Sequence, residues 1–188
     1  MRAMKRTCTI LLLLICLGAW VGSCWSRSLE VDATRVAVIK PSENSEDLRL
    51  LVSFELPDSL EGESIDFACV SFVADCAGVE GGVSFQGFVV TKAWDASTVS
   101  WSAPWDKTGG DWDSGFSAYG ITEAGSGKTV ELDVTEFAKG WLKEPSKNFG
   151  IVVRVSGPFF GTFSSEGYQE VPKLRILYSA ASRASVGD

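Results

Sequence analysis

The sequence predicts an all-β protein, a jelly-roll-type β-sandwich with one short helix. Apolar and polar residues alternate with a period of two in several short segments, of which 48–56 is the clearest, and turn residues separate these segments. Glycine is frequent, at 19 residues, and aromatic residues make up 11% of the chain, which suits strands joined by tight turns. The length of 188 residues allows one domain with short ends.

The expected strands follow the apolar pattern along the chain. Segment 65–74 is apolar on both faces, which is typical of a central strand that is covered on both sides. Segment 48–56 alternates, so its apolar face is expected to point into the core. The remaining expected strands are shorter and lie at 36–38, 83–91, 130–133, 151–155 and 174–178.

One helix is expected directly after residue 133. Its apolar residues recur at helical spacing and form one face, which consists of Val134, Phe137, Ala138, Trp141 and Leu142. Asp133 is expected to cap the helix, with Glu136 three residues later as in a capping box. Pro145 is expected to end it.

The N-terminus is typical of an export signal. Basic residues precede an apolar run at 9–21, which is too short for a comfortable membrane span. The string Val21-Gly22-Ser23-Cys24 resembles a bacterial lipobox, so residues 1–23 are expected to be a lipoprotein signal peptide and Cys24 to carry the lipid. Ordinary signal-peptidase cleavage and an uncleaved anchor helix are the alternatives.

These features divide the rest of the chain into three expected parts. Residues 24–34 form a tether, 35–178 the β-sandwich and 179–188 a flexible tail. The expected location is the cell envelope, with the domain held on a membrane by its N-terminal lipid. Trp25 stands where lipoproteins retained in an inner membrane commonly have aspartate, which favours the outer surface.

The mature chain is expected to be acidic. The full chain has a net charge of −7, and loss of residues 1–23 removes Arg2, Lys5 and Arg6, which lowers the charge to −10. An acidic domain repels nucleic acid, so nucleic acid is not expected as a partner.

The chain contains no histidine. This excludes Ser-His-Asp and Cys-His catalytic groups and every metal site that needs histidine. Asp95 and Asp133 are the carboxylates most easily mistaken for a catalytic pair, but Asp133 already has a role as a helix cap. No catalytic residue is expected, and the chain is not expected to be an enzyme. The alternative is a hydrolase or lyase that uses carboxylate or lysine chemistry.

Two cysteines remain in the expected domain once Cys24 is assigned to the lipid. Cys69 and Cys76 form an even pair in an oxidising compartment, so a disulfide between them is expected. The alternative is that Cys69 is a small buried residue on a strand, as free cysteine often is.

The segment 94–128 has little regular pattern and is the expected binding region. Connections of this length are uncommon unless they are functional, and four of the seven tryptophans lie in it. Trp105 and Trp112 are expected to offer flat apolar platforms for sugar rings, while Asp106 and Lys107 bond to sugar hydroxyls. The alternative is that both tryptophans fold back as a lid on the core.

Three carboxylates in the same segment suggest a cation site. Asp106, Asp111 and Asp113 lie among glycines, and oxygen ligands on such a loop suit Ca²⁺, although the EF-hand spacing is missing. A solvated acidic loop is the alternative. Trp94, Trp101 and Trp141 are expected in the core.

Several motifs resemble one family in order and spacing across roughly residues 35–178. They are the strand at 48–56, Trp94-Asp95-Ala96-Ser97-Thr98-Val99-Ser100-Trp101 with Pro104, Leu132-Asp133-Val134-Thr135-Glu136-Phe137 with Gly140-Trp141, Asn148-Phe149-Gly150-Ile151, and Phe163-Ser164-Ser165-Glu166 with Pro172-Lys173-Leu174. Together they resemble the DNRLRE, or disaggregatase-related, domain family, which includes carbohydrate-binding modules. Ala96 and Ser165 depart from the family pattern. The resemblance implies a β-sandwich without catalytic activity, and some members bind acidic polysaccharides such as alginate.

The expected function is that of a non-catalytic cell-envelope lipoprotein with a carbohydrate-binding β-sandwich. Its expected partner is a polysaccharide or cell-surface glycan. The alternative is a structural or adhesive surface module that contacts protein partners.

Overall fold

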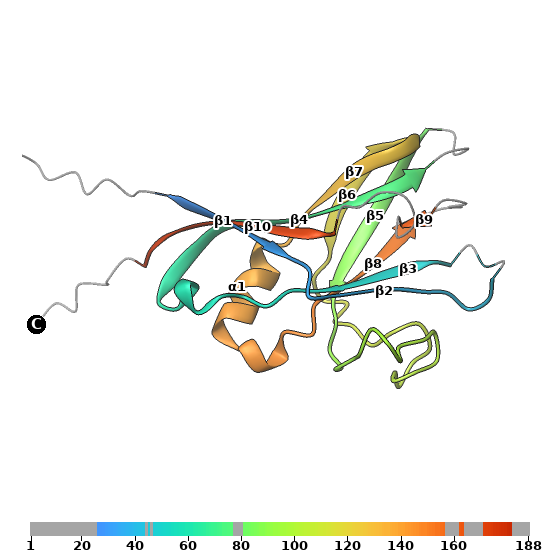
Figure 1. Ribbon diagram of the computed structural model, residues 1–188, viewed down its shortest axis with the longest axis horizontal. Helices are drawn as coiled ribbons and strands as arrows, with labels where there is room; N and C mark the ends of the chain where they lie inside the picture. Colours follow the sequence, from blue (N-terminus) through green and yellow to red (C-terminus); the bar gives the residue numbers. More distant parts are fainter. Residues whose placement is uncertain are drawn as a thin grey trace, which may run out of the picture.

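The computed structural model describes residues 26–43, 45, 47–76, 81–156, 162–163 and 171–181. Two antiparallel sheets lie face to face, and one α-helix packs against the core that they share (Figure 1). The predicted fold class, an all-β sandwich with one short helix, is confirmed.

The described strands divide into two five-stranded sheets. Sheet A contains, in spatial order, β1 (Arg27–Asp32), β10 (Lys173–Ala180), β4 (Glu63–Cys76) and β7 (Gly125–Asp133), and β9 (Thr162–Phe163) pairs with the end of β4. Sheet B contains β2 (Arg35–Ile39), β3 (Arg49–Ser53), β8 (Ile151–Ser156), β5 (Gly82–Val89) and β6 (Ala118–Glu123). The helix is α1 (Thr135–Lys143), and two 3₁₀ turns are η1 (Asp58–Leu60) and η2 (Pro145–Lys147).

The strand order is that of a jelly roll. In sheet A the last strand, β10, lies between β1 and β4, and in sheet B the late strand β8 lies between β3 and β5. Strands distant in sequence are therefore neighbours in both sheets, as in the double-sheet jelly rolls.

The main core lies between the sheets. Along β4 the even-numbered side chains from Ala68 to Cys76 point into it. Phe72 of sheet A meets Phe85 of sheet B edge to face, with ring centroids 5.7 Å apart. Because β4 pairs with β10 on one side and β7 on the other, the predicted central position of segment 65–74 is confirmed. The prediction that both of its faces are covered is wrong, because Phe67 on the outer face is 36% exposed.

Helix α1 buries the predicted apolar face but begins differently. Phe137, Ala138 and Trp141 are buried in the main core. The residue that caps the helix is Val134, and the Asp133 carboxylate instead accepts hydrogen bonds from the backbone N–H of Thr135 at 3.0 Å and its hydroxyl at 2.6 Å. The predicted capping box is therefore wrong.

The fold begins earlier than the sequence suggests. Part of the expected tether forms β1, because Leu29 and Val31 pack against the main core and the strand pairs with β10. The expected tail likewise loses its first residues to β10. Residues 1–23 and Cys24 lie outside the described residues, so the signal peptide and the lipid site stay predictions. No helix in the described part of the chain has the length and hydropathy that crossing a membrane requires.

The predicted disulfide is wrong, because Cys69 and Cys76 are both free and buried. They lie seven positions apart on the extended strand β4, about 23 Å at strand rise, where a disulfide needs Cα atoms within about 7 Å. They also lie on opposite faces of the strand, since Cys76 joins the main core and Cys69 lies opposite Arg175 and Asp133 of the neighbouring strands. Burial raises the pKa of both thiols.

Candidate binding surface

Sheet B carries a second apolar cluster on its outer face, the face turned away from the main core. Segment 91–114 leaves the end of β5 as an irregular loop and packs over one half of this face (Figure 1). The buried members of the cluster come from both the strands and the loop, namely Ile39, Leu51, Phe88, Val90, Trp94, Trp105 and Val152. The loop is therefore part of the folded body, although it contains no helix and no strand.

Arg49 fastens this loop to the sheet. Its side chain is 6% exposed, and its guanidinium donates a hydrogen bond to the carbonyl oxygen of Gly109 at 2.6 Å. Two further bonds reach the Asp47 carboxylate at 3.0 and 3.3 Å. The guanidinium also lies over the rings of Trp101 and Trp112, at 4.2 and 5.0 Å from their centroids. Burial lowers the pKa of Arg49, and the bond to Asp47 opposes that shift.

Gly109 is suited to this close approach. Its φ is +89°, which disfavours side chains, and a Cβ there would lie 2.0 Å from an Arg49 nitrogen. The glycine-rich composition of the loop therefore serves packing against Arg49.

Trp105 is buried, so its predicted role as an exposed sugar platform is wrong. The side chain is 7% exposed and its indole N–H donates to the carbonyl oxygen of Ser100 at 2.9 Å. The alternative is confirmed for Trp105, because its side chain folds back and packs into the apolar cluster on sheet B. Trp94 and Trp141 are buried as predicted, whereas Trp101 is half-buried at the edge of the outer-face cluster.

Trp112 remains a candidate, because it is half-buried and lines a groove of about 770 Å³. Its ring packs on Phe88, with centroids 6.0 Å apart. The groove also collects hydroxyl, amine and carboxylate groups from the loop and from the residues after β5, including Thr91, Lys92, Asp106, Lys107, Thr108 and Ser114. The groove thus contains the predicted binding residues Asp106, Lys107 and Trp112, whereas the buried Trp105 does not line it.

The predicted calcium site is not formed. Asp106 pairs with Lys92 at 2.5 Å, and Asp113 accepts the backbone N–H of Gly115 at 2.8 Å. Asp111 accepts the backbone N–H groups of Asp106 and Lys107 at 2.7 and 3.0 Å. Each carboxylate therefore shapes the loop, and across the described residues no three acidic or cysteine side chains converge as metal ligands.

The other half of the outer face, the open half, carries polar side chains that are half-buried or exposed. Arg154 on β8, Gln86 on β5 and Tyr119 on β6 are direct neighbours across three adjacent strands. Tyr119 is 62% exposed, and Gln86 donates from its amide to the Tyr119 hydroxyl at 3.0 Å. The Arg154 guanidinium lies 5.6 Å from the centroid of Trp112, which joins the open half to the groove.

Sequence reasoning missed Arg49, Arg154, Gln86 and Tyr119. A signal for the arginines was available, because each is a single charge within an otherwise apolar strand segment, Leu48-Arg49-Leu50 and Val153-Arg154-Val155. A charged residue between apolar ones indicates that one face of the strand packs into the apolar core and the other face does not.

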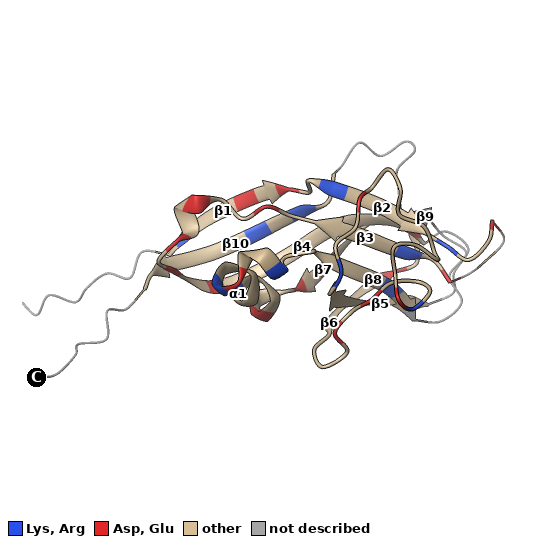
Figure 2. Cartoon of the chain, turned by 90° about the horizontal axis from the view of Figure 1, so that it is seen from below, with Lys and Arg blue, Asp and Glu red and all other residues tan. Residues whose placement is uncertain are grey.

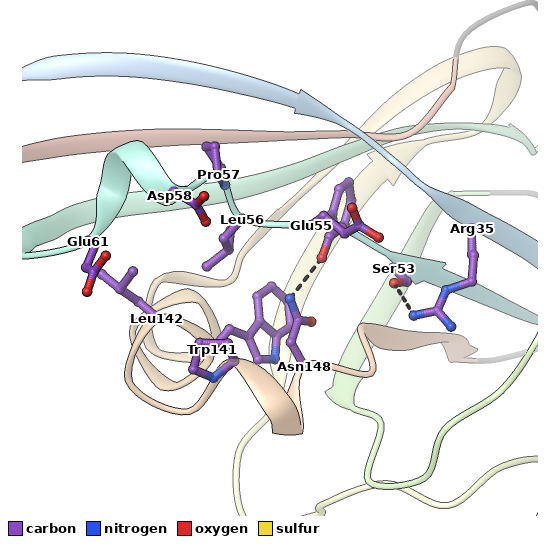
Figure 3. Close-up of a pocket in the computed structure, with 12 residues that line it drawn as sticks. Arg35, Ser53, Glu55, Leu56, Pro57, Asp58, Glu61, Trp141, Leu142 and Asn148 are labelled. Carbon is purple, nitrogen blue, oxygen red and sulfur yellow. Dashed lines mark hydrogen bonds between the residues drawn. The ribbon is translucent and has the colours of Figure 1, made fainter.

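A second cavity of about 690 Å³ lies between the segment after β3 and helix α1 (Figure 3). Two of its polar side chains are engaged within the protein, since Asn148 donates to the carbonyl oxygen of Phe54 at 2.8 Å and Arg35 to the Ser53 hydroxyl at 3.1 Å. The enclosed indole N–H of Trp141 has no hydrogen-bond partner among the described residues. These bonds join the end of β3 and the segment after it to β2 and to the residue after η2, so they belong to the fold, and the Trp112 groove is the better candidate site.

The carboxylates that resemble a catalytic pair both have local partners. The Ser97 hydroxyl and backbone N–H lower the pKa of Asp95, which is opposite to what a general acid needs. Asp133 is engaged at the start of α1.

Comparison with models of known protein families and with curated proteins finds no match to this chain. The resemblance to the DNRLRE family therefore stays a prediction.

Proposed function

We propose that this chain is a non-catalytic carbohydrate-binding module of the cell envelope, and that it binds polysaccharide at the Trp112 groove. The proposal rests on one observation: the half-buried indole of Trp112 lies in a groove that hydroxyl and amine groups also line. An indole face packs against the C–H face of a sugar ring, and the surrounding polar groups bond to its hydroxyls.

The local charge of this surface supports the proposal. The predicted mature chain is acidic, but Arg49 and Arg154 flank Trp112, and no described carboxylate forms an ion pair with Arg154. Within the groove Asp106 pairs with Lys92 and Asp111 accepts backbone N–H groups, while Lys107 adds an exposed cation. The surface therefore suits sugar hydroxyls and also sugar carboxylates, which the net charge of the chain would disfavour.

We also propose that the module is anchored through Cys24. Strand β1 begins at Arg27, so only residues 25 and 26 separate the cysteine from the folded body. Metabolic labelling with a fatty acid tests this anchor. Label should enter the wild type and be lost in Cys24→Ser, and unlabelled wild type in a lipoprotein-forming host would refute the anchor.

The test of binding is a screen of immobilised polysaccharides against the purified protein, covering neutral glucans, mannans, xylan, chitin, alginate and pectin. Trp112→Ala should weaken binding to the retained polysaccharide by about tenfold or more, the loss of one aromatic contact. Because Trp112 also packs on Phe88, a second variant, Lys107→Ala with Thr108→Ala, removes only exposed groups of the groove and should weaken the same binding.

Phe116→Ala is the matched control. Phe116 is 68% exposed and does not line the Trp112 groove, so its loss should leave polysaccharide binding unchanged. A folded wild-type protein that retains no polysaccharide would overturn the proposal, as would equal loss in the Phe116 control.

A second candidate function is a surface module that docks a protein partner. It is favoured by three exposed apolar side chains on or beside the edge strand β6: Phe116, Tyr119 and Ile121 at 68, 62 and 78% exposure. If the screen finds no polysaccharide, this function predicts that Ile121→Lys removes a cross-linked protein neighbour that wild-type cells show.

A further inference from the structure

We infer that the binding surface is a track that continues from the Trp112 groove across sheet B to its edge strand β6, with Arg154, Gln86 and Tyr119 as further contact points. The ligand would then be the interior of an extended polysaccharide chain, not a single sugar or a chain end. This inference rests on the proposed function and deepens it.

The strand register fixes the course of the track. Gln86 lies directly opposite Arg154 on one side and Tyr119 on the other. Neighbouring strands are about 4.8 Å apart, so the three residues cover roughly 10 Å of the outer face. The guanidinium of Arg154 lies 5.6 Å from the ring centroid of Trp112, so the groove and this row form one continuous surface.

Each member of the row offers a group suited to a sugar. The Tyr119 ring is exposed, and its hydroxyl accepts the bond from Gln86, which leaves the hydroxyl's own hydrogen to donate. The Nε–H of Arg154 is enclosed and has no hydrogen-bond partner among the described residues. Because this nitrogen is enclosed, a ligand on the surface would bond instead to the terminal nitrogens of the half-buried Arg154 side chain.

The ends of the track are open. At one end the track passes Trp112 into the groove, and at the other it reaches β6, which pairs only with β5 among the described strands. No described strand pairs with the outer edge of β6, and β7, which packs beside it, belongs to sheet A. A surface open at both ends accepts the middle of a polymer, and affinity then rises with the number of units that lie on it.

The row is better matched to a polysaccharide than to a protein partner. Its three side chains all carry hydrogen-bonding groups, and two of them are already bonded to each other so that the Tyr119 ring is held in place. Aromatic rings fixed beside polar groups suit sugar faces. A protein-docking surface would be expected to centre on Ile121 and Phe116 instead.

The experiment measures affinity against chain length. The polysaccharide retained in the screen is cut into a size ladder from the disaccharide upwards, and each size is titrated calorimetrically against wild type, Tyr119→Ala, Tyr119→Phe, Trp112→Ala and Phe116→Ala. Wild-type affinity should rise with length until the track is filled. Tyr119→Ala should leave the shortest ligands unchanged and weaken the long ones by about tenfold. The affinity of Tyr119→Phe for the long ligands should lie between those of wild type and Tyr119→Ala.

The outcomes separate this inference from the proposed function. Equal affinity of wild type and Tyr119→Ala for every length would overturn the track, while loss in Trp112→Ala would keep the groove. A flat length dependence in wild type would overturn it as well. Retention of no polysaccharide by folded protein would overturn both, and a Tyr119→Ala protein that loses only a protein partner would replace the track by a docking surface. Tyr119 is exposed, so circular dichroism should show an unchanged fold in both of its variants.

Discussion

The two outer faces of this sandwich use charge in opposite ways. On sheet A the charges pair with each other across strands, Lys173 with Glu30 at 2.7 Å and Arg175 with Glu131 at 3.0 Å. Figure 2 shows the acidic residues along β1 and the basic residues along β10. On sheet B, Arg49 and Arg154 face aromatic rings, and only Asp47 forms an ion pair with either of them among the described residues.

This difference favours the outer face of sheet B as the proposed binding surface. Exposed ion pairs satisfy one another and leave little for a ligand, and each adds little stability. Arg49 uses its donors on Gly109 and Asp47, whereas Arg154 is held against Trp112 with no ion pair among the described residues, so Arg154 is the one that can offer donors to a ligand. The net charge of the chain therefore says little about its partner, because it averages over two faces of different character.

The largest expected effect on stability comes from removing an aromatic side chain from the outer face of a sheet. Trp105→Ala should lower the free energy of unfolding by about 3–5 kcal/mol, because it empties a buried site beneath the loop. Phe67→Ala, the matched change on the outer face of sheet A, should cost about 1 kcal/mol because Phe67 is 36% exposed. Urea unfolding measures both, and equal costs would show that the loop is not part of the folded body.

The next largest effect compares the two kinds of arginine. Arg49→Met keeps the stem but removes the bond to Gly109, and it should cost about 2–3 kcal/mol. Arg175→Met removes an exposed pair and should cost less than about 1 kcal/mol. Arg49→Met should also release the loop to limited proteolysis. If the Arg49→Met protein is as stable and as resistant as the Arg175→Met protein, Arg49 does not fasten the loop.

The smallest effect concerns Cys69, which is buried beneath the charged surface of sheet A. Because burial raises its pKa, the folded protein keeps this thiol protonated above about pH 8.5, where an unfolded chain releases the proton. Its contribution to stability is therefore complete below that pH and is lost as the pH rises through the folded pKa. Under reducing conditions, the unfolding free energy of wild type should fall more steeply between about pH 8 and 10 than that of Cys69→Ala. The same pH dependence of the unfolding free energy in both proteins would contradict the raised pKa of Cys69.

The sequence was sufficient to predict elements whose buried face is regular. Segment 48–56 and the doubly apolar segment 65–74 are such cases, and both lie where the pattern indicated. Strand β6 was missed because its inward positions are Ala118 and Gly120 while Tyr119 and Ile121 point outward, so its apolar pattern is inverted. Gly120 is required there, since a Cβ would lie 2.6 Å from the carbonyl oxygen of Glu131.

The candidate site was harder to predict because it depends on contacts distant in sequence. The composition of the loop around Trp105 indicated a surface, but Arg49, 60 positions before Gly109, draws the loop down onto sheet B. No local pattern encodes such a contact. Trp112, Asp106 and Lys107 were found because their chemistry is local, whereas the row of Gln86, Arg154 and Tyr119 exists only after three separate strands have paired.

The pairing of the first described strand with the last one has a consequence for the order of assembly. Strand β1 finds its only described partner in β10, from Arg27 opposite Tyr178 to Asp32 opposite Lys173. A chain that emerges with its N-terminus first must therefore keep β1 unpaired until nearly all of the sequence has followed. Contacts between such distant segments form slowly, because the entropy cost of closing a long loop comes before the free energy gained from strand pairing. Completion of sheet A should thus be the late, slow step of folding, and the apolar side chains Leu29 and Val31 are the ones that a chaperone would find exposed until then.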